Sequence, residues 1–203
     1  MRYLTPMGVA VAVWATLVAT RADDAPLKDL IAGAGKGDAR SRMDLAYRYR
    51  DGNGVKRDYA EAMRWAHLVA DGGDADARDF VGWMYFEGLG VRRSPEIAAG
   101  YFQAAAGKSP SAAWNLGQCC FAGLGVDQDV PKAMDAWKKA AALGHGRSAS
   151  TAAMVYLAGD GVPPDAAEAR KLAVRAVELN EIPLRKEPFG RNPTRLRRVP
   201  LFS

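Results

Sequence analysis

A fourfold recurrence of the motif Gly-x-Gly-Val is the feature that most constrains how this chain can fold. The motif begins at Gly52, Gly88, Gly123 and Gly159, so its copies are separated by 36, 35 and 36 residues. Self-similarity at such a fixed period is typical of repeat architectures, in which one small unit stacks on the next. The sequence therefore predicts four similar units in tandem.

Residues upstream of each motif predict a helix that ends at its first glycine. Three positions before that glycine stand Tyr49, Tyr85, Cys120 and Tyr156; six positions before it stand the small residues Ala46, Gly82, Gly117 and Ala153; seven before it stand Leu45, Val81, Leu116 and Ala152. Positions −7, −6 and −3 share one face of a helix with 3.6 residues per turn. The small residue at −6 allows a neighbouring helix to approach closely.

Residues downstream of each motif predict a second helix. Three positions after the valine stand Asp58, Ser94, Asp129 and Asp165, residue types that accept hydrogen bonds from the free N–H groups at a helix start. Asp58 with Glu61, and Asp165 with Glu168, have the spacing of a reciprocal capping box. Ten positions after the valine stand Trp65, Tyr101, Ala136 and Leu172, with Trp137 displaced by one in the third copy.

These patterns predict an all-α fold, a right-handed α-α superhelical solenoid of four two-helix repeats. We assign the repeats to residues 38–73, 74–109, 110–145 and 146–180, preceded by a cap helix within 23–37 and followed by a tail at 181–203. A single two-helix unit cannot bury its apolar face alone, so the stacking of neighbours supplies the core.

The third copy carries the fullest set of repeat residues, namely Leu116-Gly117, Gly123-Leu124-Gly125-Val126, Asp129, Lys132-Ala133, Lys139-Ala140-Ala141 and Gly144-His145. In these residues the chain resembles the Sel-one-like repeat (SLR) family, relatives of the tetratricopeptide repeat, over about Asp38 to Asn180. The resemblance implies a non-enzymatic adaptor that scaffolds complexes, with exported bacterial members linked to envelope processes. Cysteine-rich members brace each repeat with a disulfide, and the adjacent Cys119 and Cys120 do not reproduce those pairs.

The first 22 residues predict a secretory signal peptide. Arg2 precedes the 15-residue apolar stretch Leu4 to Val18, and Thr20-Arg21-Ala22 places small residues at the −3 and −1 positions of a cleavage site. The stretch is shorter than the ~20 residues that usually span a bilayer. We expect an exported protein, periplasmic or secreted, with no membrane insertion after cleavage; an N-terminal membrane anchor is the alternative.

The formal net charge of +5 lies mainly outside the repeats. Residues 181–203 contain six Lys or Arg against two Glu, a net charge of +4, and residues 1–22 contribute +2, which leaves −1 for the body. A nucleic-acid-binding domain is expected to carry a basic face on its folded body. We therefore expect no nucleic-acid partner.

Four prolines in the tail, at positions 183, 188, 193 and 200, exclude a long helix there. Two interpretations of the tail remain open. It covers the last repeat through Ile182, Leu184 and Phe189, or it forms a basic arm for anionic surfaces.

No pattern of catalytic, metal-binding or cofactor-binding residues accompanies the repeats. His67 and His145 lack partner residues for catalysis, and the Gly-x-Gly segments lack the Lys-Ser/Thr ending of a phosphate-binding loop. We expect a protein that is not an enzyme and that has no cofactor. The alternatives are a cell-wall-ligand binder or a β-lactamase-like hydrolase, as described for some cysteine-rich relatives, and a targeting module whose activity lies on another chain.

Positions that the repeat leaves variable are the candidates for function. One face of each first helix carries, in turn, Met43/Tyr47/Arg50, Asp79/Trp83/Phe86, Trp114/Gln118/Phe121 and Ser150/Met154/Leu157. Aromatic residues and arginine on such a face suit a protein or peptide partner. We predict that a monomer binds an unidentified protein or peptide in a concave groove through Tyr47, Arg50, Trp83, Phe86, Trp114, Gln118 and Phe121. The alternative is that these side chains pack against adjacent helices.

Overall fold

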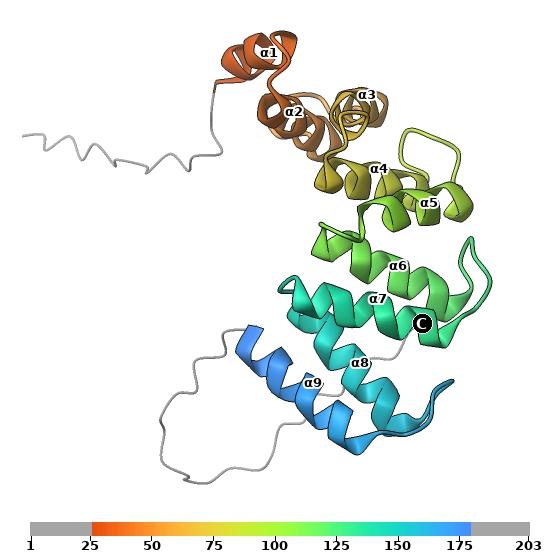
Figure 1. Ribbon diagram of the computed structural model, residues 1–203. Helices are drawn as coiled ribbons and strands as arrows, with labels where there is room; N and C mark the ends of the chain where they lie inside the picture. Colours follow the sequence, from red (N-terminus) through yellow and green to blue (C-terminus); the bar gives the residue numbers. More distant parts are fainter. Residues whose placement is uncertain (1–25, 180–203) are drawn as a thin grey trace, which may run out of the picture.

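Helices alone make up the regular structure of residues 26–179, the part of the chain that the computed structural model describes (Figure 1). They are α1 (Leu27–Gly35), α2 (Ala39–Asp51), α3 (Tyr59–Ala70), α4 (Ala75–Glu87), α5 (Pro95–Ala105), α6 (Pro110–Ala122), α7 (Val130–Ala142), α8 (Gly146–Ala158) and α9 (Ala166–Leu179). The expected signal peptide at 1–22 and tail at 181–203 lie outside the described residues.

The helices pair as α2–α3, α4–α5, α6–α7 and α8–α9, and the pairs stack into an arc (Figure 1). Helix α1 packs against α2, with Leu30, Ala34 and Leu45 in one buried cluster. In the last three repeats the Gly-x-Gly-Val loops lie on one side of the arc, at the right of Figure 1. The all-α repeat fold predicted from the sequence is confirmed.

The third repeat shows how the motif joins its two helices. Gly123 ends α6 in the left-handed conformation, and the N–H of Leu124 donates to the carbonyl of Cys119 at 2.9 Å. The N–H of Asp129 then reaches back to the carbonyl of Cys120 at 2.8 Å. The same backbone bond joins the corresponding residues of the other repeats, Asp58 to Tyr49, Ser94 to Tyr85 and Asp165 to Tyr156. The loop is therefore closed by its own backbone in all four repeats.

The predicted capping residues do begin the second helices, but the capping box is only half formed. Asp58 accepts hydrogen bonds from the N–H groups of Ala60 and Glu61 at 3.0 and 3.1 Å. Glu61 does not cap in return, because the N–H of Asp58 is already bonded to Tyr49. The Glu61 side chain instead pairs with Arg64 at 2.6 Å. The reciprocal half of that prediction is wrong.

Close contact between the two helices of a repeat depends on the small residue at −6. A Cβ added to Gly82 would lie 2.8 Å from the Phe102 ring, and one added to Gly117 would lie 2.3 Å from Nε1 of Trp137. Phe102 and Trp137 each stand eleven residues after the motif valine, where the first repeat has Ala66. This register accounts for the apparent displacement of Trp137. It also pairs each large ring with a glycine.

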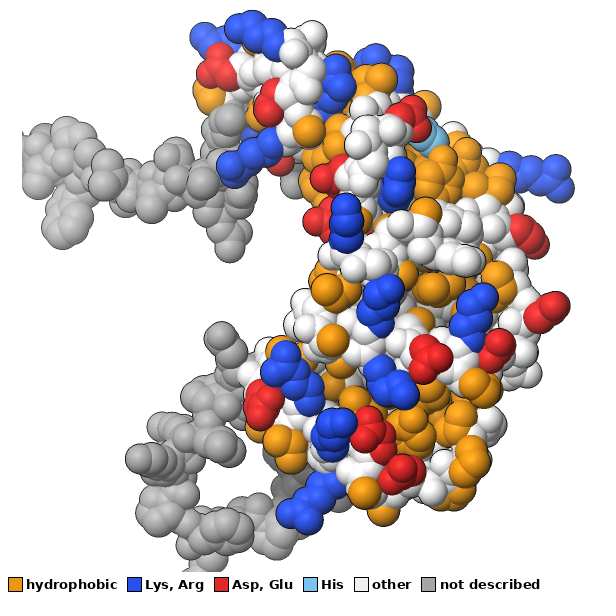
Figure 2. Space-filling view, viewed as in Figure 1, with side chains coloured by type: hydrophobic (Ala, Val, Ile, Leu, Met, Phe, Trp, Pro, Cys, Tyr) orange, Lys and Arg blue, Asp and Glu red, His pale blue; other side chains and the backbone are white. Residues whose placement is uncertain are grey.

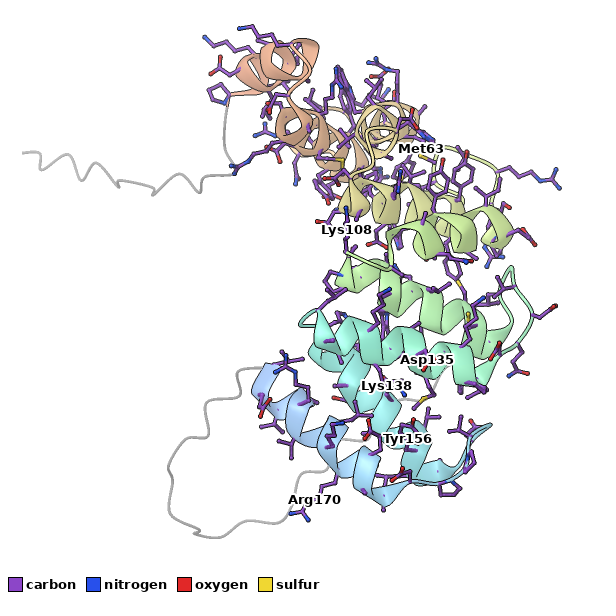
Figure 3. All side chains as sticks on the ribbon, viewed as in Figure 1. Met63, Lys108, Asp135, Lys138, Tyr156 and Arg170 are labelled. Atoms are coloured by element: carbon purple, nitrogen blue, oxygen red, sulfur yellow. The ribbon has the colours of Figure 1, made fainter. Side chains whose placement is uncertain are left out.

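Polar contacts join neighbouring repeats as well. Lys138 of α7 lies close to Tyr156 of α8, with Nζ 3.4 Å from the phenolic oxygen and 5.9 Å from the ring centroid (Figure 3). Asp135 lies 3.6 Å from the same ammonium group. Because these groups are partly exposed, the ion pair contributes little to stability.

Candidate partner-binding face

The candidate residues come from the first helices of three consecutive repeats. We call this set the first-helix face: Tyr47 and Arg50 on α2, Trp83 and Phe86 on α4, and Trp114, Gln118 and Phe121 on α6. Tyr47 is 39% exposed, and the other six side chains are half-buried. All seven thus combine packing inside the solenoid with some access to solvent.

Arg50 is the centre of a cluster that joins α2 to α4. Its Cζ lies 5.0 Å from the ring centroid of Tyr47, 5.5 Å from that of Phe80 and 5.6 Å from that of Trp83. Tyr47 and Phe80 meet edge to face, with centroids 5.2 Å apart. Such cation–π contacts orient the planar guanidinium and are worth about 0.5–1 kcal/mol each at exposed sites.

Asp51 fixes the other edge of the same guanidinium. Its carboxylate accepts from Nε of Arg50 at 2.7 Å and from Nη2 at 2.8 Å, a two-pronged pair. The hydrogen bond from Arg50 lowers the pKa of the Asp51 carboxyl and raises the pKa of the guanidinium. Arg50 is therefore held in one orientation before any partner arrives.

Asp79 and Asn115 form a second link, between α4 and α6. Nδ2 of Asn115 donates to Oδ1 of Asp79 at 2.9 Å, and the two residues are 36 positions apart, about one repeat. Burial raises the pKa of the Asp79 carboxyl to about 6; the bond from Asn115 opposes that rise, and the charge of Asp76 adds to it. The half-buried carboxylate is thus costly to ionise at neutral pH.

We expect Asp79→Asn to raise stability at pH 7.5, because the variant avoids a poorly solvated charge and its amide oxygen can still accept from Asn115. A carboxyl whose folded pKa is about 6 binds more protons folded than unfolded, so its contribution to stability is lost as pH rises from about 4 through 6. The gain should be about 1–2 kcal/mol at pH 7.5, after a discount for partial exposure. It should vanish near pH 4. Denaturant unfolding of both proteins at the two pH values measures it; a gain independent of pH would contradict the assignment.

The remaining rings pack mainly within their own repeats. The ring centroids of Trp114 and Phe121 lie 5.9 and 5.4 Å from that of the buried Trp137, and Trp114 also lies 5.3 Å from His145. Phe86 lies 6.5 Å from Phe102 of α5. These three aromatic residues thus pack against the buried core that contains Phe102 and Trp137.

The structure brings Tyr47, Arg50 and Trp83 together in one cluster, whereas Trp114 and Phe121 gather around Trp137. A role for any of the seven in partner binding stays a prediction. Phe80 and Asn115 contribute to the site but are absent from the predicted set. The spacing of one repeat between Asp79 and Asn115 was the signal that could have found that pair.

The histidine and cysteine side chains have structural surroundings. Nδ1 of His145 accepts from the N–H of Ser148 at 3.3 Å and so caps α8. Cys119 and Cys120 are buried free thiols, and burial raises the pKa of Cys119 to about 11. Within residues 26–179, no three His, Cys, Asp or Glu side chains gather as a metal would require.

Charge on the visible surface is mixed. Figure 2 shows Lys and Arg interspersed with Asp and Glu over the stacked helices, with apolar side chains between them. None of the described helices is both long enough and apolar enough to cross a membrane. On this face the basic side chains of the described residues form no continuous stripe.

A family model for the Sel1 repeat matches this chain four times, at residues 39–74, 75–108, 110–145 and 150–181. The chain belongs to the Sel1 repeat family. The resemblance inferred from the third copy is thereby confirmed. Sel1 repeats generally mediate protein–protein interactions, and the family is typically a non-catalytic scaffold.

Solved structures of the family share the fold. The protective antigen c5321 of uropathogenic Escherichia coli, which displays an SLR fold, is 29% identical with a TM-score of 0.70, over 75% of this chain and 33% of its own. A Sel1 repeat protein from Oxalobacter formigenes is 24% identical with a TM-score of 0.69, over 75% of this chain and 63% of its own. This chain therefore spans a third of the first relative and under two thirds of the second. No curated protein matches the sequence significantly.

Proposed function

We propose that this chain is a non-catalytic adaptor that acts outside the cytoplasm and binds a protein or peptide partner along the first-helix face. The observation that carries the proposal is the Arg50 cluster, in which the guanidinium lies among the rings of Tyr47, Phe80 and Trp83. Of these rings, that of Tyr47 belongs to an exposed residue. Arginine and aromatic residues are the types that dominate binding energy at protein interfaces. Export is supported by the leader sequence.

Preorganisation favours this cluster over the other candidate residues. Binding normally costs about 0.5–1.5 kcal/mol for each flexible side chain that becomes ordered. Arg50 is already ordered by its ion pair with Asp51, in which Nε lies 2.7 Å from Oδ1, and by the aromatic rings around it. A partner that offers a neutral hydrogen-bond acceptor to the guanidinium and an apolar side chain to Tyr47 would gain contacts at little entropic cost.

We expect the double variant Tyr47→Ser/Arg50→Ser to weaken partner binding at least tenfold, because two hot-spot residues each contribute on the order of 1–2 kcal/mol. The mature protein is used to capture partners from an envelope extract, and the affinity of each captured protein is then measured with purified components. Ile97→Ser on α5 is the matched control, since Ile97 is 46% exposed on a second helix. Both variants should remain helical by circular dichroism.

The control variant separates a binding defect from a general loss of structure. A partner that binds wild type and Ile97→Ser equally, but binds the double variant weakly, supports the proposal. A partner that binds all three proteins with equal affinity would show that the first-helix face is not the interface.

A further inference from the structure

Apolar side chains remain uncovered at the end of the last repeat. Val177 of α9 is 43% exposed, although its counterparts in the earlier repeats, Ala70, Ala106 and Ala141, are 3%, 5% and 2% exposed. On α8, Met154 and Leu157 are 61% and 65% exposed. We call Met154, Leu157 and Val177 the end face. Isolated exposed apolar residues are ordinary. The counterparts of Val177 are buried, however, and the counterparts of Met154 and Leu157 on the earlier first helices are at most 39% exposed. The greater exposure of all three residues at this end indicates a missing neighbour.

The neighbour that covers the counterparts of Val177 is the first helix of the following repeat. Ala141 of α7 shares a small buried cluster with Ala149 of α8, eight residues later. Ala70 and Ala77 belong to one buried cluster, seven residues apart, and Ala106 and Ala113 belong to another with the same separation. The chain therefore folds back onto each second helix seven or eight residues after this position.

The same separation, counted from Val177, leads to Leu184. We propose that the segment from Ile182 to Phe189 packs back onto the end face and closes the solenoid as a non-helical cap. The segment supplies apolar side chains at Ile182, Leu184 and Phe189, one for each member of the end face. It leaves α9 at the place where each earlier second helix gives way to the next first helix.

The composition of the segment fits an extended cap. Pro183 and Pro188 prevent a continuous helix. The six residues from Leu184 to Phe189 would span roughly 20 Å when extended, at about 3.3 Å per residue. A 13-residue helix such as α8 has a length of about 20 Å, at 1.5 Å per residue. A short extended strand of chain can therefore cover the length of the end face.

Attachment favours this segment over a second copy of the chain. A segment joined directly to α9 is present at an effective concentration in the millimolar range, far above that of a separate molecule in dilute solution. The cap should therefore form at any protein concentration.

A photocrosslinking amino acid placed at Leu157 in the full mature chain tests the proposal. At low micromolar protein we expect an intramolecular cross-link to the peptide that contains residues 182–189, identified by mass spectrometry. Leu184→Ser/Phe189→Ser in the same chain should reduce that cross-link at least fivefold, whereas Arg195→Ser/Arg197→Ser should leave it unchanged. A probe at the exposed Gln103 of α5 is the positional control and should not capture the segment.

Oxidation of Met154 by dilute peroxide gives an independent measurement. We expect its sulfoxide to form several-fold more slowly in wild type than in Leu184→Ser/Phe189→Ser, with the buried Met134, which is 2% exposed, as the internal reference. A cross-link to a second copy, a cross-link that both double variants retain, or equal oxidation rates would overturn the proposal.

Discussion

Replacing Gly117 with alanine should destabilise the protein by about 2–3 kcal/mol, because overpacking a tight core costs about 1–3 kcal/mol or more. The new Cβ would lie 2.3 Å from Nε1 of the buried Trp137, so α6 and α7 would have to separate. The penalty should exceed the gain of about 1 kcal/mol that alanine normally brings to a helix interior. Denaturant unfolding monitored by circular dichroism measures the change.

Gly100→Ala is the matched control for that substitution. Gly100 also lies within a helix, α5, but a Cβ there would meet no atom within 4 Å. We expect this variant to be more stable than wild type by about 0.5–1 kcal/mol, from helix propensity alone. Equal effects of the two substitutions would show that the contact between Gly117 and Trp137 is unimportant.

A double-mutant cycle tests the pairing directly. Trp137→Ala alone should cost about 3–5 kcal/mol, because the ring is fully buried. Gly117→Ala/Trp137→Ala should cost less than the sum of the two single changes by at least 1 kcal/mol, since contacting residues are not additive. The double variant reproduces the pair that the first repeat already contains, Ala46 with Ala66, both fully buried. Additive effects would argue against size complementarity.

Gly125→Ala should destabilise the protein by about 2–5 kcal/mol, through backbone strain of about 1–2 kcal/mol and overpacking of about 1–3 kcal/mol. Gly125 has a φ of +72°, and its Cβ would lie 2.2 Å from the carbonyl carbon and oxygen of Pro95 in the preceding repeat. Backbone atoms at the start of α5 cannot move aside as a flexible side chain can. The loop of one repeat therefore rests directly on its neighbour.

Gly54→Ala separates backbone strain from overpacking as causes of the stability loss expected for Gly125→Ala. Gly54 occupies the same motif position with a φ of +73°, but its nearest neighbour would be the end of the Arg48 side chain, at 3.6 Å. Only the strain of about 1–2 kcal/mol should appear. Thermal and denaturant unfolding of both variants give the comparison, and equal losses would mean that the contact with Pro95 adds nothing.

The repeat register could be predicted from the sequence because it is written four times. In all four copies a capping residue, Asp or Ser, stands three positions after the motif valine. Fourfold recurrence at one position argues against a chance match. The choice between glycine and alanine at −6 could not be explained in that way. The choice depends on which residue of the second helix faces this position: Ala66, Phe102 or Trp137. That residue stands eleven positions after the motif valine, one place beyond the position where the aromatic residues Trp65 and Tyr101 recur.

The site was less predictable than the fold for the same reason. The variable face of the first helices, at 9, 5 and 2 residues before the first glycine of each motif, identified Tyr47, Arg50 and Trp83, which the structure places in one cluster. Phe80 was missed because it stands at −8, beside the stripe, and it reaches Arg50 only through the packing of α4 on α2. The half-formed capping box has a similar origin. The N–H of Asp58, which Glu61 was expected to bond, donates instead to the carbonyl of Tyr49 in the preceding helix.

The backbone bond that closes each loop has a consequence for how this protein can evolve. The carbonyl three positions before the first glycine receives the bond whatever side chain that residue carries, so the third repeat has Cys120 where the others have tyrosine and still makes the bond at 2.8 Å. The side chain at this position is therefore not needed to form the turn. Whole units can be duplicated and then diverge in the residues they present, while each copy inherits a turn that closes by itself.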